Sequence, residues 1–155
     1  MNTSHAAIPP NGKASTTRRT FSRETAVGIQ IKAKPSVVWG LLTDAAAFPN
    51  WNSTVVSLEG AIKLGETIQL KSTLDESRIF SIKILEFEPD RRMVWGDRQG
   101  KRVFELVETS AGTTFTMHER MGGLLFPLFA GMIPPFDEAF EHFAADLKRA
   151  AEASK

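Results

Sequence analysis

The chain has 155 residues and no cysteine, so we expect one domain of ordinary size, and disulfides, thiolate zinc sites and cysteine nucleophiles are excluded. Lys and Arg total 19, Asp and Glu total 18, and 42% of the residues are hydrophobic. These values exclude wholesale disorder, and the formal net charge of +1 lacks the positive excess of a dedicated nucleic-acid-binding protein. We therefore expect no nucleic-acid partner.

The N-terminal residues 1–23 are predicted to form a flexible tail. They are rich in Ser, Thr, Asn, Pro and Gly, and they hold too little apolar surface to compensate for the entropy lost on ordering. The segment also lacks the apolar block of a secretory signal, and no run in the chain approaches the roughly 20 apolar residues that span a bilayer. We expect a cytoplasmic protein without an integral membrane span, whose folded domain covers residues 24–155.

A strand and two short helices are predicted to open the folded domain. Apolar residues alternate with polar or small ones from Val27 to Ile31, which is the two-residue period of a strand with one solvated face. Pro35 suits the first turn of a helix, and the apolar spacing after it predicts a helix that ends near Asp44. A second short helix is expected over residues 45–48, interrupted by the proline that follows.

Strands dominate the middle of the chain, where apolar runs are separated by turn residues and no helical period is present. The six predicted strands cover residues 54–59, 66–74, 77–88, 92–98, 101–109 and 113–121. A helix is predicted after Pro135, because apolar residues recur at helical spacing from Phe136 to Leu147. Its acidic early turns match the helix dipole.

This order of elements predicts an α+β fold in which a curved, seven-stranded antiparallel sheet covers its apolar face with the C-terminal helix. A sheet of this size curls strongly. If the helix rests on the rim of the curled sheet, an interior cavity remains, and apolar cavities are common ligand sites. The layout alone does not decide between such a cavity and a solid core.

Several motifs resemble the START-related, pollen-allergen-like (SRPBCC) superfamily, and especially its polyketide cyclase/dehydrase branch. They are Ile29-x-Ile31-x-Ala33-x-Pro35-Ser36-x-Val38-Trp39-x-x-Leu42-Thr43-Asp44-x-x-x-Phe48-Pro49-x-Trp51-Asn52, Gly65-Glu66-Thr67, Trp95-Gly96 and Thr116-Met117-His118-Glu119-Arg120-Met121-Gly122-Gly123-Leu124. The resemblance runs from about Thr25 to Ala151. It implies a helix-grip fold with a hydrophobic cavity between the sheet and the C-terminal helix. It does not fix an activity, because the superfamily includes cyclases, lipid carriers, hormone receptors and co-chaperone-like proteins.

Glu119 is the first candidate functional residue, because strand parity places it on the same face as Met117 and other apolar side chains. A poorly solvated carboxylate there could donate a proton or anchor a ligand. The alternative is a wetted or paired carboxylate at the cavity mouth. Arg78 shares its face with Phe80 and is the candidate counter-ion for Glu119, the alternative being a strand-end residue that reaches solvent.

The remaining candidate ligand-binding side chains are apolar or aromatic and are expected in the interior. They are Trp39, Trp51, Phe80, Trp95, Phe104, Met117, Phe136 and Phe140. Ordinary core packing is the alternative for all of them. The chain has no tyrosine, so shape and apolar contact would supply most of the grip on a ligand.

Histidines give no recognisable metal or acid–base pattern. His118 precedes Glu119 in a strand, so the two side chains should project from opposite faces and not form a dyad. The three histidines are scattered, and their spacing matches no metal site. We expect neither a metal nor a cofactor.

The segment 122–133 is an apolar block bracketed by glycines. It is too short to span a membrane. Three interpretations stay open: it controls access to the cavity, it docks on a membrane or protein partner, or it is buried under the sheet.

Three functional hypotheses follow. The first is a carrier or sensor that binds a small hydrophobic or lipid-like ligand in an internal cavity, with Glu119 and Arg78 at its polar end. The second is a polyketide-type cyclase or dehydratase in which Glu119 transfers a proton. The third is a co-chaperone-like or subunit-docking protein that acts through residues 122–133. The sequence also leaves a homodimer open.

Overall fold

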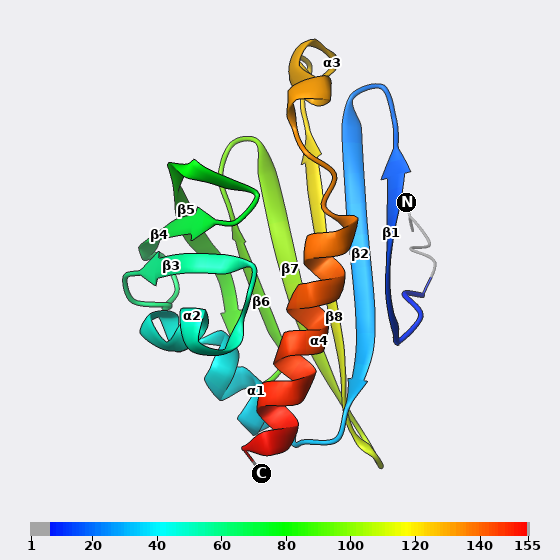
Figure 1. The fold of residues 1–155 in the computed structure, drawn as a ribbon, viewed down its shortest axis with the longest axis vertical. Coiled ribbons are helices and arrows are strands. Elements are labelled where there is room, and N and C mark those ends of the chain that lie inside the picture. The colour runs from blue at the N-terminus through cyan, green and yellow to red at the C-terminus, as the bar shows by residue number, and fades with distance from the viewer. Residues whose placement is uncertain (1–6, 155) are drawn as a thin grey trace.

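A curved antiparallel sheet surrounds one side of a long C-terminal helix (Figure 1). The computed structural model describes residues 7–154. The strands are β1 (Asn11–Arg18), β2 (Ser22–Ile31), β3 (Val55–Glu59), β4 (Thr67–Ser72), β5 (Asp75–Glu88), β6 (Arg92–Gly96), β7 (Gly100–Thr109) and β8 (Gly112–Gly122). They form one sheet in the order β1-β2-β8-β7-β6-β5-β4-β3. The α+β architecture with an antiparallel sheet is therefore confirmed.

Short helices occupy the two connections that are not hairpins. They are α1 (Pro35–Leu42), the 3₁₀ turn η1 (Ala45–Ala47) and α2 (Phe48–Trp51) after β2, and α3 (Phe126–Phe129) and the 3₁₀ turn η2 (Ala130–Met132) after β8. Pro49 lies in the first turn of α2 and does not interrupt it, because a helix tolerates proline where its N–H would have no partner. The long helix α4 covers Asp137–Ala153 and begins with Asp137 and Glu138, which suit the positive end of the helix dipole.

The strand β1 corrects two predictions: the sheet has eight strands and not seven, and residues 11–18 are not a flexible tail. β1 forms an antiparallel hairpin with β2. Main-chain hydrogen bonds to the edge of β2 stabilise this strand, and they need no apolar side chains. The polar composition of these residues therefore wrongly indicated a flexible tail. The part of the predicted tail over residues 1–6 lies outside the described residues.

Polar contacts to α4 also hold β1 in place. The backbone N–H of Ala14 donates a hydrogen bond to the Glu141 carboxylate at 3.0 Å. The hydroxyl of Thr16 donates to Asp137 and lies 2.9 Å from the hydroxyl of Thr25 on β2. The first turns of α4 are thus tied to the N-terminal edge of the sheet.

Phe143 of α4 fills the middle of the interior. Its ring centroid lies 6.0 Å from that of Phe104, 6.3 Å from Phe115, 6.1 Å from Phe48 and 6.0 Å from Trp51. Apart from Trp51, which is half-buried, all of these side chains are buried. Such aromatic clusters contribute strongly to core stability. Around Phe143 the interior is therefore a solid core and not a cavity. This answers, for the middle of the molecule, the choice between a cavity and a solid core that the order of elements left open.

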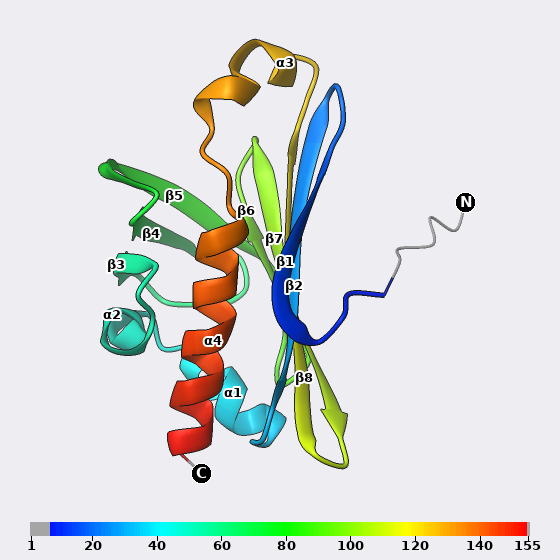
Figure 2. The same cartoon turned by 45° about the vertical axis from the view of Figure 1, so that its right-hand side comes forward.

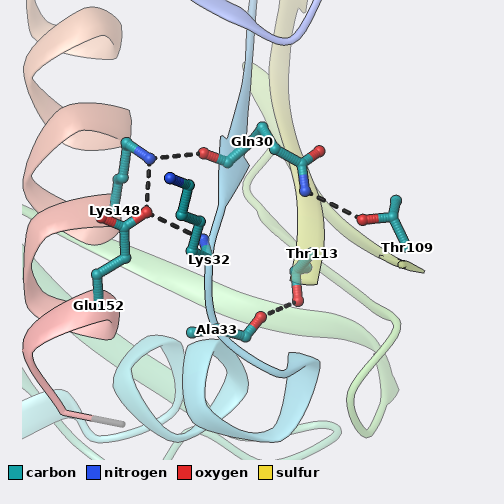
Figure 3. A network of polar contacts seen from close by, with 7 residues as sticks. All are labelled: Gln30, Lys32, Ala33, Thr109, Thr113, Lys148 and Glu152. Atoms are coloured by element: carbon teal, nitrogen blue, oxygen red, sulfur yellow. Dashed lines mark hydrogen bonds and ion pairs between the residues drawn. The ribbon is translucent and has the colours of Figure 1, made fainter. Parts of the chain in front are cut away.

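The C-terminal half of α4 is fixed to the end of β2 by a polar network (Figure 3). The Lys148 ammonium donates to the backbone carbonyl of Gln30 at 3.0 Å and to the Glu152 carboxylate at 2.5 Å. That carboxylate also accepts the backbone N–H of Lys32 at 3.0 Å. The network satisfies main-chain groups just where β2 leaves the sheet.

A buried carboxylate connects α4 to the loop between α2 and β3. Asp146 accepts hydrogen bonds from the backbone N–H and the hydroxyl of Ser53, at 2.8 and 2.6 Å, and from Arg149 at 2.5 Å. Burial alone would raise the pKa of Asp146, but the hydrogen bonds from Ser53 and Arg149 outweigh it and hold the pKa below its ordinary value of 3.8.

Replacing Asp146 should therefore destabilise the protein in a pH-dependent way. We expect Asp146→Asn to lower the free energy of unfolding by about 1–3 kcal/mol at neutral pH, because charge-assisted hydrogen bonds are lost. A carboxyl whose pKa is depressed by folding stabilises above its unfolded pKa and stops doing so as the pH falls through its folded value. The difference from wild type should thus shrink below pH 3.8, as measured by urea unfolding. Glu138→Gln, at an exposed site on the same helix, is the control. An equal loss of stability for Asp146→Asn at neutral pH and below pH 3.8 would contradict the depressed pKa of Asp146.

Candidate functional site

A cavity of about 190 Å³ lies at the N-terminal end of α4. The segment that descends from α3 to α4 forms one wall (Figure 2), and strands β4 to β8 form the others. Apolar side chains from both layers line it, among them Leu70, Phe80, Trp95, Met121, Ile133 and Phe136. The cavity exists because the aromatic cluster around Phe143 lies deeper along α4, so nothing of that size occupies the space above it.

An ion pair forms the polar part of this cavity. The Nε–H of Arg102 donates to the Glu119 carboxylate at 2.9 Å, and the two side chains are only 13% and 16% exposed. The guanidinium carbon of Arg102 also lies 4.9 Å from the ring centroid of Phe140, in a cation–π arrangement. The two charges are therefore held between an aromatic face and the cavity.

Sequence reasoning had named Arg78 as the counter-ion of Glu119, and the structure corrects this assignment to Arg102. Arg78 lines the same cavity, but it is exposed, and its guanidinium carbon lies 4.9 Å from the ring centroid of Phe80. The signal that would have found Arg102 is the hairpin register. Residues 102 and 119 are equally distant from the turn at 110–111, so antiparallel pairing places them opposite one another.

The predicted site residues divide into two groups. Those that line the cavity are Glu119, Arg78, Phe80, Trp95 and Phe136. The others lie deeper: Met117 and Phe140 border a small void of about 30 Å³, whereas Trp39, Trp51 and Phe104 line neither space. Trp95 and Arg102 border both spaces.

Three tryptophan and phenylalanine positions that were predicted to contact a ligand are instead core residues. Trp39 packs edge-on against Phe87, with ring centroids 5.2 Å apart. Phe104 packs edge-on against Trp95 at 4.7 Å, and Trp51 tilts against Phe48 at 4.7 Å. The sequence pattern showed that these rings point inward, but not how far along the helix axis each one lies.

Arg23 anchors the wall that precedes α4. Its guanidinium donates to the carbonyl oxygens of Ile133 and Pro134 at 3.2 and 3.0 Å and lies 4.6 Å from the ring centroid of Phe136. Burial lowers the pKa of Arg23, the charge of Arg18 adds to this, and nearby carboxylates offset part of it. Sequence reasoning had assigned Arg23 to the tail, although it has the same parity as the inward-facing residues of β2.

The other titratable groups that were considered lie apart from the cavity. His118 is on the opposite face of β8 from Glu119, with its Nδ1 3.5 Å from the carboxylate of Glu24 on β2. Within residues 7–154, no cluster of three or more His, Asp or Glu side chains could hold a metal ion. The same residues contain no helix that is both long and apolar enough to cross a membrane.

A second depression, of about 550 Å³, lies near the start of α1. Charged side chains line much of it, and two of them are paired: Arg92 contacts Glu105 at 2.8 Å, and it also contacts Glu86, outside the depression, at 3.3 Å. Surface pairs of this kind contribute little to stability and satisfy one another. The smaller, largely apolar cavity is therefore the better candidate for a ligand site.

An antiparallel sheet that grips a C-terminal helix, with a cavity under one end of that helix, defines the helix-grip class of proteins. The sequence profile of the family described as polyketide cyclase/dehydrase and lipid transport matches residues 19–152. The chain belongs to this family, and the resemblance noted in the sequence is confirmed. A search of curated proteins finds no match.

Solved structures share the fold at low sequence identity. A protein from Rhodobacter sphaeroides aligns with a TM-score of 0.68 and 16% identity over 92% of this chain and 100% of its own. A protein from Nitrosomonas europaea gives 0.67 and 17% over 89% and 98%. DynU16, from the dynemicin biosynthetic locus, gives 0.64 and 19% over 85% of this chain and 48% of its own. At these identities the likeness shows the fold alone.

Arg102 and Arg78 line the same cavity, but only Arg102 is paired with Glu119. The two arginines should therefore differ in how much they stabilise the protein. We expect Arg102→Gln to lower the free energy of unfolding by about 1–3 kcal/mol, because it leaves a half-buried carboxylate without its partner. Arg78→Gln should change it by less than about 0.5 kcal/mol, because that side chain is exposed.

Urea unfolding of both variants and of Glu119→Gln measures these effects, and the double variant Arg102→Gln/Glu119→Gln closes the cycle. The double variant should lose less than the sum of the single losses. Equal losses for Arg78→Gln and Arg102→Gln, or strict additivity in the cycle, would contradict the pairing.

Proposed function

We propose that this protein binds a compact, mainly apolar ligand that carries a polar oxygen group, in the cavity at the N-terminal end of α4. The observation that carries the proposal is an apolar cavity with a half-buried ion pair, Arg102–Glu119, in its wall. Apolar contact would supply most of the affinity, and a fixed charged group would orient the ligand. This agrees with the family, whose description includes both cyclases and lipid transport.

The ion pair leaves hydrogen-bonding capacity for a guest. Glu119 accepts the Nε–H of Arg102, and the side-chain hydrogen bonds found among the described residues include none from the two terminal guanidinium nitrogens of Arg102. Guanidinium donors in a fixed fork suit a carbonyl, hydroxyl or carboxylate oxygen. A ligand oxygen placed at Arg102 would put its apolar part against Trp95 and Phe136, which line the same space.

The size of the cavity limits the ligand. Its 190 Å³ is below the roughly 300–1,000 Å³ typical of pockets for drug-sized molecules, and the aromatic cluster around Phe143 closes it from below. A single ring system or a short chain fits within such a volume. A longer lipid-like molecule would place only one end at the ion pair and would extend out past the segment before α4.

Filling the cavity should weaken binding. We expect naphthol or a medium-chain fatty acid to raise the melting temperature of the wild-type protein and to appear as a complex in native mass spectrometry. Leu74→Trp, which places a larger side chain in the cavity wall, should weaken binding tenfold or more, at a packing cost of about 1–3 kcal/mol. Leu64→Trp, at an exposed loop position, is the matched control and should bind like wild type. Binding that Leu74→Trp leaves unchanged would place the ligand elsewhere.

Catalysis on a polyketide-like substrate is the second candidate function, and the position of Glu119 favours it. Glu119 is a carboxylate on the cavity wall that is held by a guanidinium, so it is suited to accept a proton rather than to donate one. It would take a proton from a carbon next to a carbonyl, and Arg102 would stabilise the enolate oxygen that forms. Attack of the enolate carbon on a second carbonyl would then close a ring, and the proton held by Glu119 would pass to the alkoxide oxygen that forms, which regenerates the carboxylate.

Replacing this carboxylate separates binding from catalysis. Glu119→Gln should reduce turnover of a poly-β-ketone substrate by about 10²-fold or more, while the ligand-induced rise in melting temperature persists. Asp97→Asn is the control, because Asp97 also lines the cavity but accepts hydrogen bonds from the backbone of Gln99 and Gly100 in its own turn. Full turnover by Glu119→Gln would rule out this role.

A further inference from the structure

The β1–β2 turn and the segment after β8 lie together at one end of the molecule (Figure 1). Large apolar side chains of these two segments are exposed to solvent. This apolar tip consists of Phe21, Leu124, Leu125, Leu128 and Met132. The two segments are in contact, since the backbone N–H of residue 123 donates to the carbonyl of Phe21 at 3.0 Å. The sequence had left burial of residues 122–133 under the sheet open, and the structure places much of this segment outside it.

The side chains of the apolar tip are far more exposed than side chains that pack in a core. Leu124 is 87% exposed, Leu128 78% and Met132 79%, whereas Phe126 between them is buried and anchors the segment. Among residues 7–154, the other exposed large apolar side chains are spread over β3, β5, β7 and one loop, with two of them on β5. Clustered exposed apolar residues mark interaction sites, whereas isolated ones need no explanation.

The charge around the apolar tip is positive. Segments 18–23 and 120–136 together contain four arginines and no carboxylate. Arg18, Arg19 and Arg120 are exposed, whereas Arg23 turns inward to backbone carbonyls. The carboxylates that directly border these segments are engaged: Glu24 with His118, Glu119 with Arg102, and Asp137 with Thr16.

We propose that the apolar tip docks on an anionic membrane surface. Leucine side chains would enter the boundary between headgroups and acyl chains, and Arg18 and Arg19 would lie at the level of the lipid phosphates. A second copy of the chain fits less well, because a symmetric contact would bring Arg18 and Arg19 against the same charges of the other copy. The proposal goes beyond ligand binding and does not depend on it.

The apolar tip is continuous with the cavity wall. Met132 belongs to both, and Ile133 and Phe136, which follow it, line the cavity. Docking would therefore place the wall segment between the lipid surface and the cavity. A molecule could then pass between them without crossing much water.

Vesicle sedimentation with the full chain tests the proposal. We expect the protein to pellet with phosphatidylcholine vesicles that contain phosphatidylserine, more weakly with phosphatidylcholine alone, and less as salt rises. Leu124→Ser/Leu128→Ser should lower the partition coefficient about tenfold or more. Arg18→Gln/Arg19→Gln should lower it by roughly tenfold on the anionic vesicles only.

Matched variants at other exposed positions serve as controls. Leu64→Ser/Val107→Ser removes exposed apolar side chains away from the tip, and Lys63→Gln/Lys83→Gln removes exposed cations, so both should bind vesicles like wild type. All variants change exposed side chains and should keep the wild-type melting temperature, which thermal unfolding checks.

Three results would overturn the proposal. The first is no sedimentation of wild type with either vesicle, and the second is tip variants that bind like their controls. The third is a wild-type dimer in analytical ultracentrifugation that Leu124→Ser/Leu128→Ser converts to a monomer without loss of vesicle binding. That result would identify the tip as a contact between two copies.

Discussion

The packing of Phe143 against the inner face of the sheet determines where the interior is filled and where it stays open. This ring contacts aromatic side chains from α2, β7 and β8 and closes the interior at mid-height. Because protein interiors are packed at nearly crystalline density, a space opens only where the helix no longer supplies a side chain. That happens above the first turn of α4, and the cavity lies there. A helix-grip fold therefore does not always contain a large cavity. In this protein a single residue of the C-terminal helix, Phe143, limits how deep the cavity is.

The ion pair of Arg102 and Glu119 survives in this setting because it is only partly removed from water. A fully buried pair would have to overcome a large desolvation cost, whereas these side chains keep 13% and 16% of their exposure. The aromatic face of Phe140 supports the cation from the other side. Charge and apolar surface thus meet in one small volume, and the proposed class of ligand rests on this arrangement.

The sequence predicted the features that follow from side-chain periodicity. The period of two gave most strands, and the apolar stripe from Phe136 to Leu147 gave α4 and its buried face. It missed β1, which is stabilised by main-chain pairing and by Asp137 and Glu141 of α4, because hydrogen bonds between distant segments leave no local pattern. Cross-strand register likewise decides that Arg102 and not Arg78 pairs with Glu119. Parity says which face a side chain is on, but not which neighbour it meets.

The two ends of α4 are held by different partners. The C-terminal half is bonded to the end of β2 through Lys148 and Glu152, while the first turns depend on β1 through Thr16 and Ala14. The cavity lies at the end held by β1. The polar composition of β1 alone would not identify it as a strand, yet β1 is consequently part of the scaffold that holds the cavity in place, although it contributes no side chain to the cavity wall.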